Sequence, residues 1–428
     1  MLGHLKMERQ NKRVAETDRL SDLPDHVLLH IIESMNIKQS VQTCILSKRW
    51  KDLWKHLTNL KFHHSYPDIS DMFCKFVSQI LSGRNHYIPL HSLDFELEDR
   101  VDPPKTTLLD VMRYAESSHN MQQLTVYARV RQISDLELPP SIFSSRSLTY
   151  LKLGFWQIYG SNSGKTTFPK SLNLPSLKTL HLRCLTFTTS DDGRAEPFSA
   201  CNMLDTLVII CCYLQDNAQV LCISNSNVSS LTVGSNYVYD KAHNYNVVLC
   251  TPKLTSLTAS GRPTFKAPSA HDLPFLEEVN IDYTYYYRPH EDPVLISWLQ
   301  LLANVKIMTL RFKTLVKMLC VSYFKISSPL YFWRFLWNIR PYAKNFPINK
   351  QSFLSNIHSL QCIQLTLFIQ ALKNTGSMSV QPPCFVRLKS LKVEVKSDDN
   401  ISNGKVRKIV KFLLQNSPPA RLDIIRQS

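Results

Sequence analysis

The chain has 428 residues, of which 44% are apolar and 20% are charged, so it is long enough for two or three domains with buried cores. Its 10 glycines and 23 prolines exclude collagen-like chains and glycine-rich linkers. No apolar run approaches the roughly 18 residues that span a bilayer, and the polar opening lacks the apolar core of a signal peptide. The 11 cysteines include no C-x-x-C pair, which favours reduced thiols over disulfides or zinc. We therefore expect a soluble intracellular protein, in the nucleus, the cytoplasm or both.

The net charge of +16 is concentrated at one end of the chain. Residues 1–300 hold 30 basic and 30 acidic side chains, whereas residues 301–428 hold 20 basic and 4 acidic ones. A charge block of this kind favours an acidic partner or an anionic surface, but a solvated basic face has the same pattern. The sequence leaves both interpretations open.

Residues 18–62 have the apolar pattern of three short helices, and a polar tail precedes them. A first helix is expected to start near Pro24, whose fixed φ suits a first helical turn. A second short segment contains Val41, and a third helix is expected to begin at Ser47. These predictions together indicate a small all-α module.

This module is too small to shield all of its own apolar side chains from water. The side chains in question are Leu28, Ile32, Leu46, Trp50 and Trp54. Two tryptophans near a polar rim fit the usual composition of a binding hot spot. We expect a second polypeptide to cover part of this surface, with packing against the following domain as the alternative.

The module contains two sequence runs whose apolar residues have a distinctive spacing. They read Leu23-Pro24-Asp25-x-Val27-Leu28-x-x-Ile31 and Val41-x-Thr43-x-Ile45-Leu46-Ser47-Lys48-Arg49-Trp50-x-x-Leu53-Trp54. Together they resemble the two halves of the plant F-box. The resemblance implies docking onto a Skp-type adaptor and, through it, onto a cullin ubiquitin ligase. The positions that match the motif, and so would contact the adaptor, are Leu20, Leu23, Pro24, Val27, Leu28, Ile31, Val41, Ile45, Leu46, Trp50, Leu53 and Trp54.

From about residue 90 a short pattern, apolar-x-x-apolar-x-apolar, returns at spacings of 22 to 31 residues. It is the strand signature of a leucine-rich repeat. The central apolar residues are Leu93, Leu124, Leu151, Leu180, Leu207, Leu231, Leu257, Val279 and Met308. Because each repeat buries its strand only against its neighbours, the array is expected to stack into a curved solenoid. The predicted fold class is α+β: a short all-α module followed by an irregular leucine-rich-repeat α/β solenoid with a parallel sheet on the concave face.

Side chains between the buried strand positions should point outward and are candidates for contact with a target protein. We single out Lys178, His181, Arg183, Glu278, Asn280 and Asp282. Ordinary solvation of a sheet face explains any one of them equally well.

The repeat phase is lost after Met308 and returns at Leu360-Ile363-Leu365. Between these points, residues 321–351 hold nine aromatic and five basic side chains and no acidic one. This segment is either a basic, aromatic insert suited to nucleic acid or a membrane surface, or a retained intron. We favour the intron, because Val-Ser and Gln at its ends can be encoded by splice-site consensus sequences. Sequencing the transcript decides between the two.

The C-terminal segment contains one more helical stripe. It consists of Val406, Ile409, Val410 and Leu413 and ends before Pro418-Pro419. Together with the closing residues it resembles the end of the F-box-associated (FBD) region of plant relatives, and we expect it to cap the last repeat. The predicted divisions are a tail at 1–17, the F-box at 18–62, a linker helix region at 63–89, repeats at 90–320, the insert at 321–351, last repeats at 352–395 and an FBD-like cap at 396–428.

Two motifs mimic other chemistry. Residues 160–166 end like a nucleotide-binding loop, but three residues separate the glycines where four are needed. His26 and His30 share a helix face without a third ligand. We therefore expect no cofactor, no metal and no catalytic residue, and disfavour membrane and nucleic-acid partners. The favoured function is a non-catalytic substrate-recognition subunit of a Skp–cullin–F-box ubiquitin ligase. The alternatives are a nucleic-acid-binding protein that uses the basic C-terminal part, and an inactive mis-spliced family member.

Overall fold

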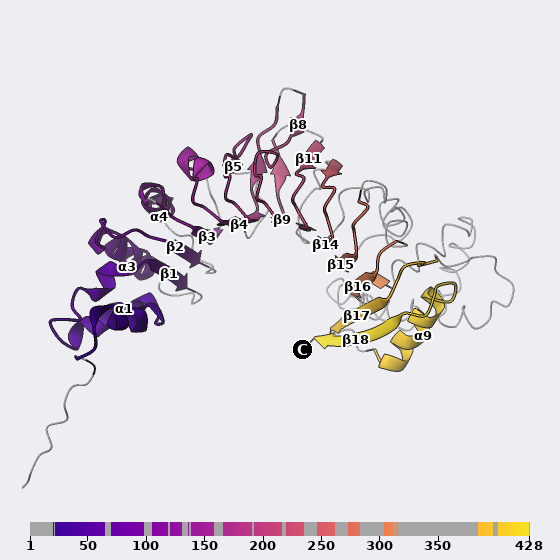
Figure 1. The fold of residues 1–428 in the computed structure, drawn as a ribbon, viewed down its shortest axis with the longest axis horizontal. Helices are drawn as coiled ribbons and strands as arrows, with labels where there is room; N and C mark the ends of the chain where they lie inside the picture. The colour runs from indigo at the N-terminus through magenta and orange to yellow at the C-terminus, as the bar shows by residue number, and fades with distance from the viewer. Residues whose placement is uncertain are drawn as a thin grey trace, which may run out of the picture.

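The computed structural model describes residues 20, 22–64, 70–97, 105–118, 120–130, 136, 138–157, 166–190, 192–215, 220–234, 246–261, 273–282, 304–311, 314–315, 384–396 and 401–427. These residues form a curved solenoid with a small helical module at its N-terminal end (Figure 1). Strands line the inner side of the curve, and helices and short strands lie outside them (Figure 1). The α+β fold predicted from the sequence is confirmed.

The N-terminal module is built from four short helical elements. They are α1 (Asp25–Glu33), α2 (Ile37–Gln42) and the 3-10 helices η1 (Thr43–Ile45) and η2 (Leu53–His56). Pro24 stands at the N-cap of α1 in an extended conformation, and the side chain of Asn36 caps α2 by accepting a hydrogen bond from the amide of Gln39. The prediction of a third helix from Ser47 is wrong. The chain there forms single turns before η2 begins. These turns are closed by backbone hydrogen bonds between residues three apart, such as the bond that Trp50 N donates to Ser47 O (3.1 Å).

Across the residues that the structure describes, twelve strands form one parallel sheet in the order β1-β2-β3-β4-β6-β9-β12-β14-β15-β16-β17-β18. Their bounds are β1 Asn59–His64, β2 Ser92–Leu97, β3 Gln123–Val130, β4 Tyr150–Gln157, β6 Thr179–Arg183, β9 Thr206–Ile210, β12 Ser230–Gly234, β14 Ser256–Ser260, β15 Glu278–Asp282, β16 Ile307–Arg311, β17 Ser390–Lys396 and β18 Arg421–Gln427.

The nine central apolar residues predicted for the repeats all fall in one row of the sheet. The paired positions run Leu93, Leu124, Leu151, Leu180, Leu207, Leu231, Leu257, Val279 and Met308. Leu60 extends the row at one end, and Leu391 and Leu422 extend it at the other. Within most of these strands buried residues alternate with more exposed ones, so one face meets the core and the other faces the concave side.

The two ends of the sheet differ from the prediction. Strand β1 comes from the last residues of the F-box run, and β18 comes from the closing residues of the chain; neither strand was predicted. Strand β16 pairs directly with β17, with Met308 opposite Leu391. The repeat strand predicted at Leu360–Leu365 and the insert at 321–351 both lie outside the described residues, and the intron hypothesis stays a prediction.

The outer layer changes character along the solenoid. It contains α3 (Ser70–Gly83), α4 (Lys105–Ser117) and the 3-10 helix η3 (Pro140–Ser144), then two three-stranded sheets, and finally α9 (Asn403–Leu413). The small sheets are β10 (Tyr213–Leu214), β7 (Thr186–Phe187) and β5 (Thr167–Phe168), and β13 (Asn246–Cys250), β11 (Val220–Ser224) and β8 (Arg194–Ala195).

Four buried phenylalanines connect successive rungs beneath this layer. Phe143, Phe168, Phe187 and Phe198 contact edge to face, with ring centroids 5.2, 5.5 and 5.7 Å apart in turn. Such edge-to-face pairs add about 0.5–1.5 kcal/mol each beyond the area that they bury. The aromatic row therefore helps to hold together the part of the solenoid where short strands replace helices.

The helical stripe predicted near the C-terminus forms α9. Its apolar side chains Val406, Ile409, Val410 and Leu413 are all buried and belong to the continuous core, and their role as a cap on the last repeat stays a prediction. The segment predicted as a linker helix at 63–89 does contain a helix, α3, but its side chains Val77, Ile80 and Leu81 belong to the continuous core. It is a full rung of the solenoid rather than a connection between separate bodies.

Candidate protein-docking surfaces

The F-box module buries several residues that the motif alone placed on its docking surface. Leu28, Trp50 and Leu53 belong to the core, with Trp50 only 3% exposed. The Trp54 ring packs against the end of α3, where its Cη2 atom lies 3.1 Å from the position of a Cβ on Gly83. The chain itself therefore covers Trp50, contrary to the expectation that this side chain awaits a partner, whereas Trp54 stays half-buried.

Other apolar side chains of the module remain in water. Ile45 is 83% exposed, Leu46 59% and Leu20 52%, and Pro24 is exposed as well. Leu23, Val27, Ile31, Val41 and Trp54 are half-buried. Leu28, Trp50 and Leu53 therefore support the module from inside, and the remaining nine predicted positions reach its surface.

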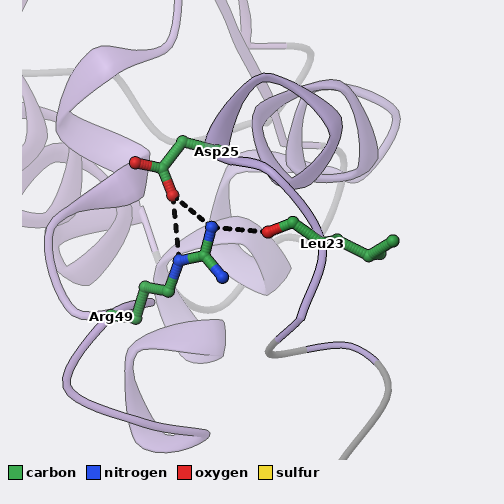
Figure 2. A network of polar contacts seen from close by, with 3 residues as sticks. All are labelled: Leu23, Asp25 and Arg49. Carbon is green, nitrogen blue, oxygen red and sulfur yellow. Dashed lines mark hydrogen bonds and ion pairs between the residues drawn. The ribbon is translucent and has the colours of Figure 1, made fainter.

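Arg49 joins the two sequence runs that form this surface (Figure 2). Its Nε and Nη2 atoms donate to Asp25 Oδ1 at 2.9 and 2.6 Å, and Nη2 also donates to the carbonyl oxygen of Leu23 at 2.5 Å. The segment that enters α1 is thereby held against the turn that follows Leu46. Neither Arg49 nor Asp25 was singled out from the sequence, although each lies in one half of the motif.

A polar and aromatic cluster occupies the concave face of β2, β3, β4 and β6. Lys152 pairs with Glu96 and lies 5.2 Å from the ring centroid of Tyr127, and the guanidinium of Arg183 lies 5.8 Å from the same centroid. Gly154 makes this possible, because a Cβ there would lie 2.7 Å from the Tyr127 ring. Two cations from neighbouring strands therefore lie within cation–π distance of one aromatic ring.

His181 and Tyr150 form the neighbouring part of this cluster. Their ring centroids lie 5.5 Å apart. Burial, together with the positive charge of Lys152, lowers the pKa of His181, so its imidazole is neutral at pH 7. Burial raises the pKa of Tyr150, and the charges of Asp94 and Glu96 act in the same direction. Burial is the largest influence on Lys152 and opposes its charged form, but the hydrogen bond that Lys152 donates to Glu96 and the negative charges of Glu96 and Asp94 together outweigh burial and raise the pKa of this lysine.

A second charged cluster lies on the concave face of β15, β16, β17 and β18. Arg311 is 3.0 Å from Asp282 and 3.8 Å from Glu394, and Gln427 donates to Glu394 at 3.0 Å. Burial raises the pKa of Asp282 despite the positive charge of Arg311. Glu278 and Asn280 lie on the same face of β15.

The six residues predicted to contact a target thus form two groups rather than one. His181 and Arg183 lie in the first cluster, with Lys178 exposed just before their strand, and Glu278, Asn280 and Asp282 lie in the second. Between the two groups, β9, β12 and β14 present Val208, Thr232 and Thr258, which carry no charge. The concave face therefore has two polar ends and an uncharged middle.

The basic excess of the C-terminal part shows most clearly on α9. Its exposed side carries Lys405, Arg407, Lys408 and Lys411, and the helix contains no acidic residue. Helix α9 lies beside β17 and β18 at the C-terminal end of the solenoid (Figure 1).

The other motifs give no site within the described residues. His26 and His30 are exposed on α1, and across the described ranges no group of three or more His, Cys, Asp or Glu is arranged to hold a metal ion. Most of the loop at 160–166 lies outside the described residues. Of the helices that the structure describes, none combines the length and apolar character needed to cross a membrane.

Comparison with known proteins agrees with both parts of this architecture. The F-box domain family matches residues 20–62, and the family described as "FBD-associated F-box protein At5g56370, LRR repeats" matches residues 113–280. Both matches end before the C-terminal cap, so its likeness to the FBD region stays a prediction.

Among curated proteins of Arabidopsis thaliana, the chain is similar to three that carry related descriptions. The F-box/FBD/LRR-repeat protein At1g80470 is 26% identical over 72% of this chain, and the match spans 64% of that relative's length. The F-box protein At1g60400 is 27% identical over 70% of this chain and 72% of its own length, and the FBD-associated F-box protein At5g60610 is 29% identical over 69% of each. Residues 20–62 accordingly match the F-box domain, residues 113–280 match the leucine-rich repeats of an FBD-associated F-box protein, and the chain as a whole is similar to plant proteins of these descriptions.

Proposed function

We propose that this chain is the substrate-recognition subunit of a Skp–cullin–F-box ubiquitin ligase. The observation that carries the proposal is the exposure of Ile45 (83%) and Leu46 (59%), which are the most exposed large hydrophobic side chains that the structure describes in the module. Two adjacent, highly exposed aliphatic side chains, with Leu20 exposed on the same module, fit a protein contact better than a solvated surface. Each can contribute up to about 1.5–3 kcal/mol when a partner covers it.

The proposed adaptor-docking surface has Ile45 and Leu46 at its centre. Leu20, Leu23 and Pro24 extend it across the Arg49 bridge, and Val27, Ile31, Val41 and Trp54 form its half-buried edge. Because Arg49 already holds the two runs together, the surface needs little rearrangement before a partner binds, which lowers the entropic cost of docking.

The concave face is the proposed site for a target protein. Tyr150 and Arg183 are of the residue types enriched in binding hot spots; the Tyr150 ring lies against His181, and Arg183 lies against the Tyr127 ring. In this scheme the chain performs no bond chemistry. It brings a bound target close to the enzyme that other subunits recruit, and so raises the effective concentration of the target's lysines. We propose the nucleus and cytoplasm as its compartments.

Co-purification with a Skp-type adaptor tests the proposal. The double variant Ile45→Asp/Leu46→Asp should lose the adaptor, because two carboxylates would be desolvated in the contact. Val386→Asp is the matched control, since Val386 is also exposed and apolar but lies at the far end of the solenoid. Leu23→Ala/Pro24→Ala should also lose the adaptor while the repeats stay folded. Adaptor capture by the Ile45→Asp/Leu46→Asp chain at the level of the wild type would overturn the proposal.

A second candidate function rests on the four exposed cations of α9. A helix face with only positive charge suits a polyanion such as nucleic acid. The same face is compatible with simple solvation, and its test is described in the Discussion.

A further inference from the structure

The junction between the F-box and the solenoid contains a buried arginine. Arg84 follows α3 directly and is only 3% exposed. Its guanidinium donates to oxygens from three separate segments. These acceptors are Leu57 O at 2.9 Å, Asn85 O at 3.3 Å, Ile88 O at 2.9 Å, Pro89 O at 3.1 Å and the Tyr114 hydroxyl at 3.1 Å.

The chemistry of the guanidinium makes this arrangement specific. Arginine keeps its charge in proteins, and burying a charge is costly unless polar groups compensate it. Here four backbone carbonyl dipoles and one hydroxyl surround the cation. The N–H groups of the guanidinium lie in one plane and point in fixed directions. They can therefore reach all five acceptors only when Leu57, the loop at 85–89 and α4 have one particular arrangement.

Neighbouring contacts tie the same pieces together. The amide of Asn85 donates to Lys55 O at 3.1 Å, and the amide of His91 donates to Thr58 O at 2.8 Å. Thr58 also donates through its hydroxyl to Glu33 at 2.8 Å, which connects the end of α1 to the start of β1. The F-box is therefore bonded to the second rung rather than connected to it by a free linker.

We propose that Arg84 is a positioning residue, which fixes the angle between the F-box and the concave face. Its consequence for ubiquitin transfer rests on the function proposed above. With a rigid junction, a target on the concave face stays at one distance from the enzyme that the adaptor recruits, so transfer favours a small set of lysines. Loosening the junction leaves both docking surfaces intact but spreads the distances between them.

Distance measurement in the full chain tests the rigidity without any partner. Two spin labels on non-natural residues, one at Lys38 in α2 and one at Lys253 before β14, report the angle between the F-box and the solenoid by pulsed electron resonance. The wild type should give one narrow distance distribution, and Arg84→Met should broaden it at least twofold. Arg426→Met is the control, because Arg426 also donates to a backbone carbonyl, Ile401 O, but near the C-terminal end.

Each outcome bears on the proposal. A narrow distribution in a folded Arg84→Met chain overturns it, as does equal broadening in Arg426→Met. If Arg84→Met does not fold, Arg84→Lys takes its place, since it keeps the charge but loses the fork, and an unchanged distribution there contradicts the proposal. Adaptor affinity is measured in parallel and should be unchanged by Arg84→Met. Failure of the wild type to bind the adaptor would refute the proposed function but leave the distance result standing.

Discussion

Asp25 and Arg49, 24 residues apart in the chain, form a 2.6 Å ion pair that holds the two runs of the F-box together (Figure 2). Both side chains are partly exposed, so the pair adds little to the stability of the free chain. Its effect is to keep the segment around Leu23 beside the turn that carries Ile45 and Leu46. The pair therefore prepares a docking surface rather than a core.

The first prediction concerns this pair. Arg49→Ala should weaken adaptor binding about 2- to 5-fold, which corresponds to the roughly 0.5–1 kcal/mol typical of an exposed pair. Calorimetric titration with the adaptor measures the change. The control is Lys55→Gln, which removes the other exposed pair of the module, between Lys55 and Asp52 at 2.7 Å. An equal loss in both variants would show that Arg49 has no special place.

The second prediction concerns Gly154 on the concave face. A Cβ at this position would lie 2.7 Å from the Tyr127 ring, so Gly154→Ala must displace that ring from Lys152 and Arg183. We expect a loss of about 1–3 kcal/mol in the free energy of unfolding, measured by denaturant titration. Gly404→Ala is the matched control, because nothing lies within 4 Å of a Cβ there and alanine favours the helix by up to about 1 kcal/mol. Equal stabilities for the two variants would refute the packing described for Tyr127.

The third prediction concerns the pH dependence of stability. The folded chain holds the pKa of His181 below its ordinary value of 6.5, so the unfolded chain binds the proton more readily. Stability from this group is therefore present above pH 6.5 and is lost as the pH falls below it. Between pH 7 and pH 5 the wild type should lose more stability than His181→Gln, as followed by thermal unfolding. Equal losses of stability in the wild type and in His181→Gln would be inconsistent with a half-buried, neutral imidazole at this position.

The fourth prediction separates the two candidate functions. Replacing Lys405, Arg407, Lys408 and Lys411 by Glu should leave adaptor binding unchanged, because α9 lies at the opposite end of the solenoid (Figure 1). Any affinity of the wild type for duplex DNA should fall steeply with added salt and disappear in this variant. Tight binding to one DNA sequence at 0.2 M salt would instead favour the nucleic-acid alternative.

Much of the fold could be predicted from the sequence because the repeats bury one residue type at one position. Leu93, Leu180 and Leu257 lie in a single row of the sheet although the spacings between repeats vary. Variation in length is taken up by the outer layer, where helices give way to short strands. Strand pairing requires only that the apolar residues of neighbouring strands lie in register. The row of central apolar residues was therefore predicted correctly even where the repeat length varies.

The remaining features depend on contacts between distant residues. Trp54 matches a docking position of the motif, and only the structure shows that part of its ring also lies against Gly83. Met308 pairs with Leu391, although the sequence between them contains a further predicted repeat strand at Leu360–Leu365. Arg49 and Arg84 both donate hydrogen bonds to backbone carbonyls. Every residue has such a carbonyl, so the sequence does not indicate which ones these arginines contact. Sequence patterns report which side chains are apolar, whereas these features depend on what lies beside them.

Hydrogen exchange of the intact chain, alone and with a Skp-type adaptor, tests the docking surface most directly. The account predicts slower exchange over residues 22–27 and 41–47, around Ile45 and Leu46, with little change over the concave strands β4 and β6. Slower exchange confined to the concave face, or none over residues 41–47 while the adaptor is bound, would contradict it.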